Sequence, residues 1–403
     1  MRGLTNDEIL VLERAAAEPM LDQVQSWAAI NSGSRNLPGL AEMARLYVDA
    51  FAALPGTLSL RDPAAVDAME ADGSLKHLAH GQNLHLKVRP EAPVQLLFTG
   101  HMDTVFGTDH PFQALAWREE GVLNGPGVAD MKGGIAVMLA ALKAVETAPG
   151  ASQLGYEVVI NSDEEVGSPG SAPLIAEAAR GKKAALTYEP AALPDGTLAG
   201  ARPGSGNFSI FIEGKSAHAG RNPEDGRNAI VAAADLALRL SKAKGPRLSV
   251  NPARIEGGSP NNVVPDRAVL RVNMRPFTPE DEERARSSLD AAIAMVAAEH
   301  QVKIHVHGGF GRPPKPLDAQ AERLFTLVKA CGADLGQQIE WRATGGVCDG
   351  NNIAACGVPV VDTMGVRGGA IHSSDEYLIV DSLVERAQLS ALTILRLASG
   401  EHL

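Results

Sequence analysis

The chain has 403 residues, of which 45% are hydrophobic, and a formal net charge of −11 at pH 7. This length exceeds what one ordinary core holds, so two domains are expected, and the hydrophobic content excludes a disordered chain. The acidic balance disfavours nucleic acids and anionic membranes as partners, because both attract clustered cations. No apolar run approaches the roughly 18 residues that span a bilayer.

Cysteine usage and the start of the chain bear on location. Cys331, Cys348 and Cys356 lack the C-x-x-C spacing of a thiolate metal site, and unpaired thiols fit a reducing compartment. The apolar stretch 9–12 is too short, and too soon followed by charge, for a signal peptide. We therefore expect a cytoplasmic protein.

The first 203 residues alternate between predicted helices and strands. A capping-box pattern, Thr5-x-x-Glu8, opens a helical stretch over 5–30, and a second amphipathic helix covers 39–53. Such alternation predicts a mainly parallel sheet with helices on its faces. The further predicted strands are 57–61, 84–90, 94–99, 156–161 and 183–188, and the further helices are 133–146 and 172–180.

The pattern changes near Gly204 and changes back after residue 312. Between them the predicted order is β-α-β-β-α-β, which is the split ferredoxin-like unit. We expect one α/β domain, built from 1–203 and 313–403, that is interrupted by an inserted α+β domain at 204–312. The inserted elements are strands 208–212, 247–256, 268–274 and 302–307 with helices 228–240 and 279–299; a proline-rich linker at 312–316, helices 319–331 and 381–398, and strands 339–343 and 358–363 follow.

An apolar strand that breaks at Gly100 delivers His101 and Asp103. Positions i and i+2 of an extended chain face the same side, which suits a metal-ligating imidazole with a carboxylate beside it. The carboxyl ends of parallel strands form the edge where ligands collect, so other polar residues of strand ends and loops are candidates for the same site. These are Asp130, in a glycine-rich loop before a helix, and Glu164, Glu165, Glu189 and His372.

Two imidazoles and three carboxylates give mixed nitrogen and oxygen ligation, which suits zinc, with cobalt or manganese as substitutes. Two such cations about 3.5–4 Å apart can share one carboxylate and one water, whose pKa they lower. A further carboxylate must then accept the proton of that water. Glu164 and Glu165 suit this division, because neighbours on an extended chain face opposite ways.

Four strings together resemble the di-zinc exopeptidases and deacylases: 100–105, 127–134, 163–168 and 372–377. That family includes glutamate carboxypeptidase, succinyl-diaminopimelate desuccinylase, acetylornithine deacetylase and aminoacylase, and the resemblance covers nearly the whole chain. It implies a general base at Glu164, a partner of His101 at Asp103, and a cis peptide bond after the bridging residue Asp130. It implies as zinc ligands His101, Asp130, Glu165, Glu189 and His372.

The inserted segment also resembles the family. The string 214–220 is similar to a loop whose imidazole, here His218, helps to stabilise the tetrahedral intermediate, often across a dimer. The segments around Asn262 and Arg275 resemble substrate-contact segments. We expect these two side chains to hold a substrate carboxylate, because a guanidinium pairs with it bidentately.

A glycine-rich loop that begins at Gly345 and Gly346 resembles a further substrate-contact loop. The family usually has threonine or serine where Val347 and Cys348 stand, so a hydroxyl contact to the substrate is not expected from these positions. Glu189, rather than aspartate, favours the carboxypeptidase and deacylase branches over aminopeptidases.

The resemblance implies a homodimer through 204–312 and hydrolysis of an amide bond to an amino acid with a free carboxylate. Release of a C-terminal glutamate is the leading specific hypothesis. The rivals are an N-acyl-amino-acid or small-molecule deacylase and, more distantly, a catalytically silent binding protein of the same fold. A lone His-x-Asp pair or acidic turn is more often structural, so only the joint occurrence of the strings indicates a catalytic site.

Overall fold

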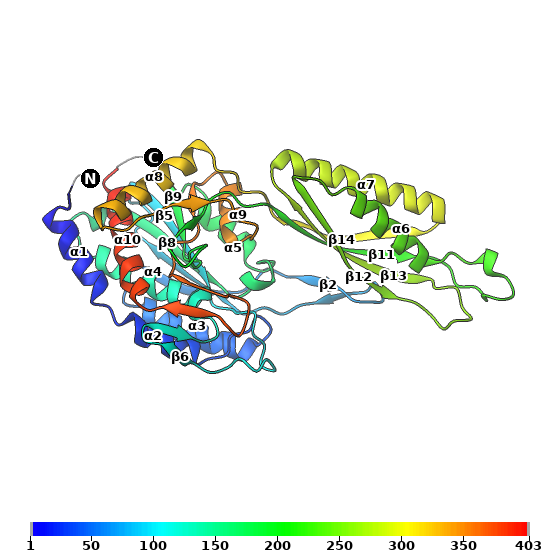
Figure 1. Cartoon of the computed structure of the whole chain (residues 1–403), viewed down its shortest axis with the longest axis horizontal. Coiled ribbons are helices and arrows are strands. Elements are labelled where there is room, and N and C mark those ends of the chain that lie inside the picture. Colours follow the sequence, from blue (N-terminus) through cyan, green and yellow to red (C-terminus); the bar gives the residue numbers. More distant parts are fainter. Residues whose placement is uncertain (1–2, 401–403) are drawn as a thin grey trace.

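The computed structural model describes residues 3–400 and consists of a larger and a smaller body arranged along one long axis (Figure 1). Both ends of the chain lie on the larger body, where helices cover a central sheet. The smaller body is a second sheet with two helices, α6 and α7, packed on it. Within residues 3–400, no helix is long and apolar enough to cross a membrane.

The sheet of the larger body has six strands in the order β1-β4-β8-β5-β9-β16. Strand β5 is parallel to β8 and β9, and β9 is parallel to β16, whereas β1 and β4 are antiparallel. The predicted α/β fold with a mixed, mainly parallel sheet is confirmed. The strands are β1 (Thr57–Arg61), β4 (Asn83–Val88), β5 (Val94–His101), β8 (Leu154–Asn161), β9 (Ala184–Thr187) and β16 (Val360–Val361).

Helices bury both faces of this sheet, as the alternation of side chains along β5 shows. Leu96 and Phe98 belong to the large core with α1, α2, α3, α4, α8 and α10, whereas Leu97 packs with α5 and α9. These helices are α1 (Asn6–Ala16), α2 (Met20–Ala28), α3 (Leu37–Phe51), α4 (Gly133–Val145), α5 (Ala172–Ala179), α8 (Ala319–Asp334), α9 (Asp349–Ala355) and α10 (Asp381–Ala398).

The smaller body is a four-stranded antiparallel sheet in the order β12-β13-β11-β14, with its own hydrophobic core. This order and its two helices are those of the predicted ferredoxin-like unit. The domain boundaries at 204 and 312 stay a prediction, although the first strand begins one residue after 204. The elements are β11 (Ser205–Glu213), α6 (Ala229–Lys242), β12 (Leu248–Gly257), β13 (Arg267–Pro276), α7 (Pro279–His300) and β14 (Lys303–Arg312).

A hairpin arm of β2 (Asp67–Met69) and β3 (Leu75–His77) reaches from the larger body to the smaller one (Figure 1). The Arg271 side chain donates a 2.6 Å hydrogen bond to the Met69 carbonyl, and His307 Nε2 lies 2.8 Å from the Asp67 carbonyl. A Cβ atom at Gly73 would meet the ring of Phe211 at 2.5 Å. The arm therefore forms a contact between the two bodies in addition to the two places where the chain passes from one body to the other, before β11 and after β14.

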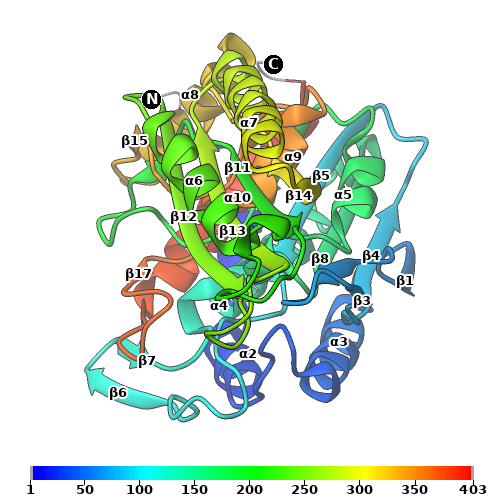
Figure 2. The ribbon, with the colours of Figure 1, turned by 90° about the vertical axis from the view of Figure 1, so that its right-hand side faces the viewer.

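The sequence did not predict a second, small sheet in the order β17-β18-β7-β6. It joins the loops before residue 133 to the loops after residue 367, and Figure 2 shows β7 and β17 on the same side of the larger body. A parallel pair, β10 and β15, also lies outside the main sheet. The strands are β6 (Ala116–Glu119), β7 (Val122–Asn124), β17 (Gly368–Gly369), β18 (Tyr377–Ile379), β10 (Leu198–Ala199) and β15 (Trp341–Arg342).

Three predicted elements differ from the structure, one of them the strand at 358–363, which is present only as the two residues of β16. The single helix over 5–30 is wrong, because the chain forms α1 and α2 with Pro19 between them, and proline interrupts a helix by removing a hydrogen-bond donor. The strand at 339–343 is present only as the two residues of β15, which pairs outside the main sheet. Helix α9, which the sequence did not predict, covers one face of the main sheet.

Gly134 provides a test of how tightly α4 packs. A Cβ atom there would meet the carbonyl oxygen of Tyr188 at 2.0 Å, so Gly134→Ala must displace main chain. We expect it to lower the free energy of unfolding by about 1–3 kcal/mol, measured by urea denaturation. Gly150→Ala is the matched control, because nothing lies within 4 Å of a Cβ there. Equal stability of the two variants would contradict the packing argument.

Candidate metal centre

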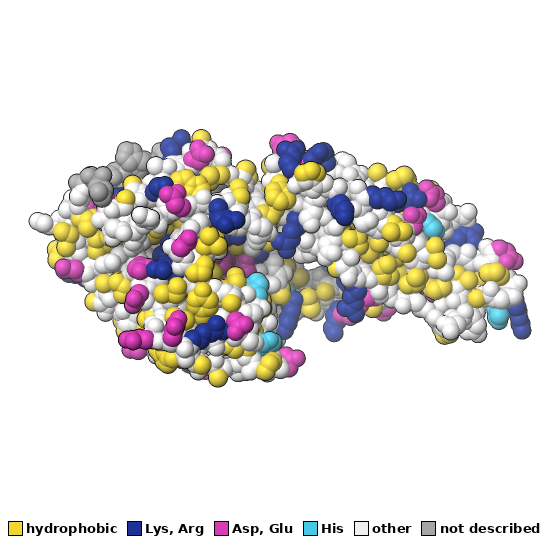
Figure 3. Space-filling view, viewed as in Figure 1, with side chains coloured by type: hydrophobic (Ala, Val, Ile, Leu, Met, Phe, Trp, Pro, Cys, Tyr) yellow, Lys and Arg dark blue, Asp and Glu magenta, His cyan; other side chains and the backbone are white. Residues whose placement is uncertain are grey.

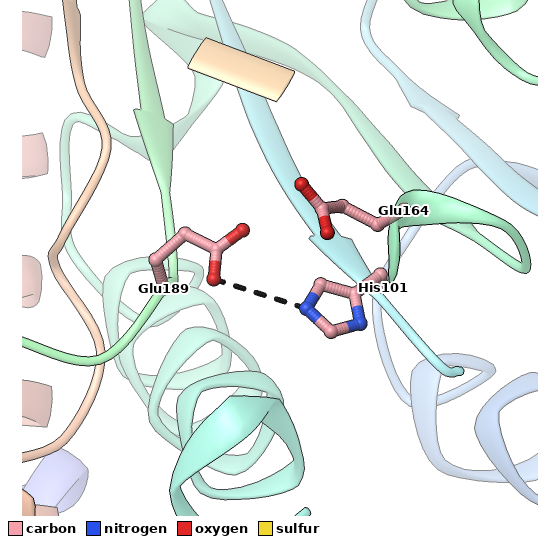
Figure 4. A group of neighbouring side chains, drawn as sticks. All are labelled: His101, Glu164 and Glu189. Carbon is pink, nitrogen blue, oxygen red and sulfur yellow. Dashed lines mark ion pairs between the residues drawn. The ribbon is translucent and has the colours of Figure 1, made fainter. Parts of the chain in front are cut away.

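The centre lies at the carboxyl ends of the parallel strands, where an α/β sheet collects ligands. His101 ends β5, Glu164 and Glu165 follow β8, and Glu189 follows β9. Figure 4 shows His101, Glu164 and Glu189 pointing toward one another from three separate segments. Asp130 comes from the loop before α4, where its peptide bond to the next residue is cis, as the resemblance implied.

Asp130 lies between the two histidine side chains. Its Oδ1 atom is 3.1 Å from His101 Nε2, and its Oδ2 atom is 3.3 Å from His372 Nε2. His372 Nε2 is also 3.1 Å from Glu165 Oε2, and His101 Nε2 is 3.8 Å from Glu189 Oε2. The five predicted ligands therefore form two groups that share one carboxylate, although their roles as ligands stay a prediction.

The donor set fits a pair of divalent ions. His101, Asp130 and Glu165 offer ligand atoms that all lie within 4.8 Å of one another, and so do His101, Glu164 and Glu189. Neutral imidazole with carboxylate oxygen suits zinc, cobalt or manganese. Several carboxylates this close together and this deeply buried require positive charge nearby.

Asp103 holds both His101 and the glutamate pair, but not quite as the resemblance implied. The nearest contact of His101 Nδ1 is the main-chain carbonyl of Asp103 at 2.9 Å, with the carboxylate at 3.4 Å. A proton on Nδ1 would leave Nε2 free to ligate. The Asp103 carboxylate accepts hydrogen bonds from Ser34 Oγ and from the main-chain N–H groups of Glu164 and Glu165, at 2.7, 3.1 and 3.2 Å.

Glu164 and Glu165 diverge, but the predicted reason was wrong, because they lie in a 3-10 turn, Glu164–Val166, and not on an extended chain. Glu165 turns toward His372, whereas Glu164 Oε1 lies 2.7 Å from Nη2 of the buried Arg312. Arg312 is the last residue of β14, so the smaller body supplies the cation that faces Glu164. Its guanidinium also donates to the Glu164 carbonyl at 3.0 Å and lies 3.4 Å from Asp349.

Burial and neighbouring charge shift the carboxyl groups in different directions. Burial raises the pKa of Glu164 to about 7 against the lowering effect of Arg312, and burial with the Asp130 charge raises the pKa of Glu165 to about 8. Burial also raises the pKa of Glu189. For Asp130 burial acts the same way, but the two histidines outweigh it and lower the pKa.

The imidazoles respond to the same carboxylates. Burial alone would lower the pKa of His101, but Asp103, Asp130 and Glu189 raise it well above 6.5. Hydrogen bonds to Asp130 and Glu165 raise the pKa of His372 to about 11. Without metal, imidazolium charge therefore compensates the buried carboxylates.

His218 and Asn262 lie away from this centre. Both are exposed, and the loops that carry them pair at His218 and Val263, before the start of β13. Arg275 is near the other end of β13, which spans about 30 Å at about 3.4 Å per residue. Within one chain, the structure therefore does not bring Asn262 together with Arg275.

Two cavities meet at the centre and share Glu164, Glu165 and His372. One has a volume of about 430 Å³, lies among the loops of the larger body and is lined by Arg202. The other, of about 860 Å³, lies between the two bodies and is lined by Arg275. Figure 3 shows the hollow between the bodies, with acidic and basic side chains on its walls.

The glycine-rich loop borders both cavities. Arg275 Nη1 donates to the Gly345 carbonyl at 3.0 Å, and Gly346 lines both cavities. Cys348 is buried, and burial raises the pKa of its thiol. Thr344 lines the smaller cavity and lies 3.4 Å from Arg202 Nη1, so a hydroxyl is present near the position where the family pattern expected one.

Sequence reasoning missed Arg312 and Glu376. From the sequence we assigned Arg312 to the start of the proline-rich linker, and an arginine followed by two prolines matches no motif for binding or catalysis. Glu376 is buried and accepts main-chain hydrogen bonds from residues 127, 129 and 130. It belongs to one of the strings that carry the resemblance, and its acidic character inside that string was the only available signal.

Comparisons with known proteins agree with these motifs. A family model described as peptidase family M20/M25/M40 matches residues 97–396. Carboxypeptidase G2 of Pseudomonas sp. (strain RS-16) is 33% identical over 80% of this chain and 79% of its own. Succinyl-diaminopimelate desuccinylase of Psychrobacter arcticus is 27% identical over 77% and 80%, respectively. The structure of a tripeptidase from Staphylococcus aureus subsp. aureus Mu50 has the same fold, with a TM-score of 0.72 at 23% identity over 96% of this chain and 99% of that one.

Metal binding should release protons. At pH 7 the imidazoles of His101 and His372 carry protons in the metal-free protein, since their pKa values are raised, to about 11 for His372. An imidazole must lose its proton to ligate, so affinity for zinc should rise with pH as the competing proton is lost. Calorimetric titrations in two buffers of different ionisation enthalpy should give a release of more than two protons at pH 7, because the ligand Glu165, whose pKa is about 8, loses a proton as well as the two imidazoles. No net release at pH 7 would contradict the assignment of these two ligands.

Proposed function

The chain belongs to peptidase family M20/M25/M40, and on that premise we propose that it hydrolyses an amide bond to an amino acid with a free carboxylate. Release of a C-terminal glutamate is the specific activity we propose first. The observation that carries the proposal is the position of Asp130 between two histidine–glutamate pairs, His101 with Glu189 and His372 with Glu165. Glu164 lies beside the first pair.

We propose two divalent ions as cofactors, zinc first, with cobalt or manganese as substitutes. His101 and Glu189 would hold one ion, His372 and Glu165 the other, and Asp130 both. When bound, the pair supplies an activated water and polarises the amide carbonyl. The proposed ligand atoms already face one another at 3.1–3.8 Å in the structure.

Glu164 is the proposed general base. It stands beside the ligands, and Arg312 fixes its carboxylate at 2.7 Å. A carboxylate so placed accepts a proton from the attacking water and returns it to the leaving amine. Asp103 would keep Glu164 in place through the main-chain hydrogen bond that it accepts.

Arg275 is the proposed holder of the substrate carboxylate, because it lines the larger cavity on the side of the smaller body. The glutamate preference rests on the resemblance to glutamate carboxypeptidases, and the relative at 33% identity is named a carboxypeptidase. Gly345 and Gly346 would form the opposite wall, since Gly345 accepts a hydrogen bond from Arg275.

We propose a homodimer through 204–312 that brings His218 and Asn262 to the partner's centre. Both residues are exposed and lie near one end of β13, whereas Arg275 is near the other end. A dimer would let Asn262 of one chain and Arg275 of the other hold one carboxylate. His218 would then stabilise the charge that develops on the carbonyl oxygen.

We also propose a cytoplasmic location. Cys331, Cys348 and Cys356 are all free thiols, two of them buried, which fits a reducing compartment.

The two adjacent glutamates allow a matched test. Glu164→Gln should keep the affinity for zinc and lower kcat by about 10²–10⁴-fold, because it removes only the proton acceptor. Glu165→Gln should lose zinc affinity, since it removes a ligand. Zinc content and the rate of amide hydrolysis are measured on both purified variants. Near-normal turnover by Glu164→Gln refutes the assigned base.

Substrate class separates the proposal from its rivals. A panel of dipeptides, N-acyl amino acids and acyl-glutamates should show the highest kcat/KM where glutamate is released. A preference for N-acyl groups that ignores the amino acid would favour the deacylase, to which the 27% identical desuccinylase points. Absent hydrolysis across the panel would instead favour the silent binding protein, and hydrolysis that a chelator does not inhibit would contradict the proposed metal ions.

Mixing two inactive variants tests the dimer. His218→Ala and Glu164→Gln each remove one group of the proposed composite site, yet a mixed dimer contains one intact site. After subunit exchange we expect activity to return to about a quarter of wild type, because half the dimers are mixed and each has one working site. No recovery, with exchange verified by mass spectrometry, would show that His218 does not act across the dimer.

A further inference from the structure

Two of the proposed ligands stand on loops outside the main sheet. Asp130 lies in the irregular helical turn Val128–Lys132 of the loop region between β7 and α4, and His372 lies in the turn between β17 and β18. The side chain of His372 is 55% exposed, and its φ of 62° is in the left-handed region, which disfavours residues other than glycine. Something other than the main sheet must therefore hold these ligands in register.

The carboxylate of Glu376 connects these two loops. Glu376 is 1% exposed and lies four residues after His372. Its Oε1 atom accepts hydrogen bonds from the main-chain N–H groups of Ala129 and Asp130, both at 3.0 Å. Its Oε2 atom accepts a third, from Gly127, at 3.2 Å. One side chain of the histidine loop thus fixes the main chain of the aspartate loop.

The connection is reciprocal. Asn124, at the end of β7, donates its side-chain amide to the carbonyl groups of Glu376 and Ser374, at 2.6 and 3.2 Å. We call the contacts of Glu376 and Asn124 the loop clasp. Each loop therefore contributes one side chain that binds the main chain of the other.

We propose that Glu376 is a positioning residue that sets the affinity of the second metal ion, the one held by His372 and Glu165. It does so by fixing the main chain of Asp130 relative to the His372 turn through the loop clasp. The inference rests on the proposed metal site and goes beyond its ligands. Glu376 itself faces main-chain donors and does not act as a ligand.

The two ions depend on the loop clasp to different degrees. The first ion has His101 and Glu189 from the ends of β5 and β9, so only Asp130 comes from a clasped loop. The second ion has two of its three ligands, Asp130 and His372, on clasped loops. Loss of the loop clasp should therefore weaken the second ion more than the first.

Glu376→Gln is the direct test, because the amide keeps the shape but turns an NH2 group toward main-chain donors. Metal-stripped full-length protein is titrated with zinc against a chromophoric chelator. We expect the second ion to bind about 10–100-fold more weakly, as is typical when a group that orients a ligand is lost. The same titration of His372→Ala shows which of the two binding steps belongs to the second ion, because that step should be lost in this variant.

Asp375→Asn is the matched control. Asp375 is the neighbouring carboxylate on the same turn, but its side chain is 79% exposed and pairs with Arg118. This variant should bind both ions with wild-type affinity. If it loses as much as Glu376→Gln, the effect comes from loop charge, and the proposal is overturned.

The remaining outcomes are also decisive. Unchanged affinity at both ions in Glu376→Gln, or an equal loss at both, overturns the positioning role. If that variant does not fold, Asn124→Ala removes the reciprocal half of the loop clasp and is judged by the same criteria. If the wild-type protein binds no zinc, the proposed metal site itself is refuted. If the wild-type protein binds two ions and Glu376→Gln binds them equally well, only the positioning role is refuted.

Discussion

The structure depends on the placement of buried negative charge around two imidazoles. Asp130 contacts both His101 and His372. Three further carboxylates lie within ion-pairing range of the same two imidazoles: Asp103, Glu165 and Glu189. Burying such charges without compensation costs several kcal/mol for each ion. The fold supplies Arg312 on one side, the two imidazoles in the middle, and main-chain N–H groups around Asp103 and Glu376.

Two separate frameworks meet at this point. The parallel strands of the main sheet place His101, the Glu164–Glu165 pair and Glu189 at one edge, as α/β sheets do. The small sheet of β17, β18, β7 and β6 places Asp130 and His372. The smaller body adds Arg312 at the end of β14, so the orientation of that body affects the surroundings of Glu164. The hairpin arm contacts the same body through the hydrogen bond between Arg271 and Met69.

The sequence predicted the features that leave a local pattern, either a periodic alternation of residues or a motif shared with a family. Period-two alternation at Phe208, Ile210 and Ile212 predicted a half-buried strand, and the order of elements predicted both folds, which the structure and the family comparison confirm. It did not predict the hairpin arm or the small sheet of β17, β18, β7 and β6, because most of these strands have two or three residues and such lengths show no periodicity. It also missed Arg312 and Glu376, whose roles come from contacts with distant main chain rather than from a local pattern. The sequence also could not show that Asn262 and Arg275 lie apart, because this follows from their positions at opposite ends of β13.

Anomalous diffraction at the zinc edge, from crystals of the zinc-loaded protein, tests the central claim most directly. The account predicts two zinc peaks about 3.5–4 Å apart, one on each side of Asp130, with His101 near one and His372 near the other. A single peak, or two peaks that Asp130 does not bridge, would contradict it.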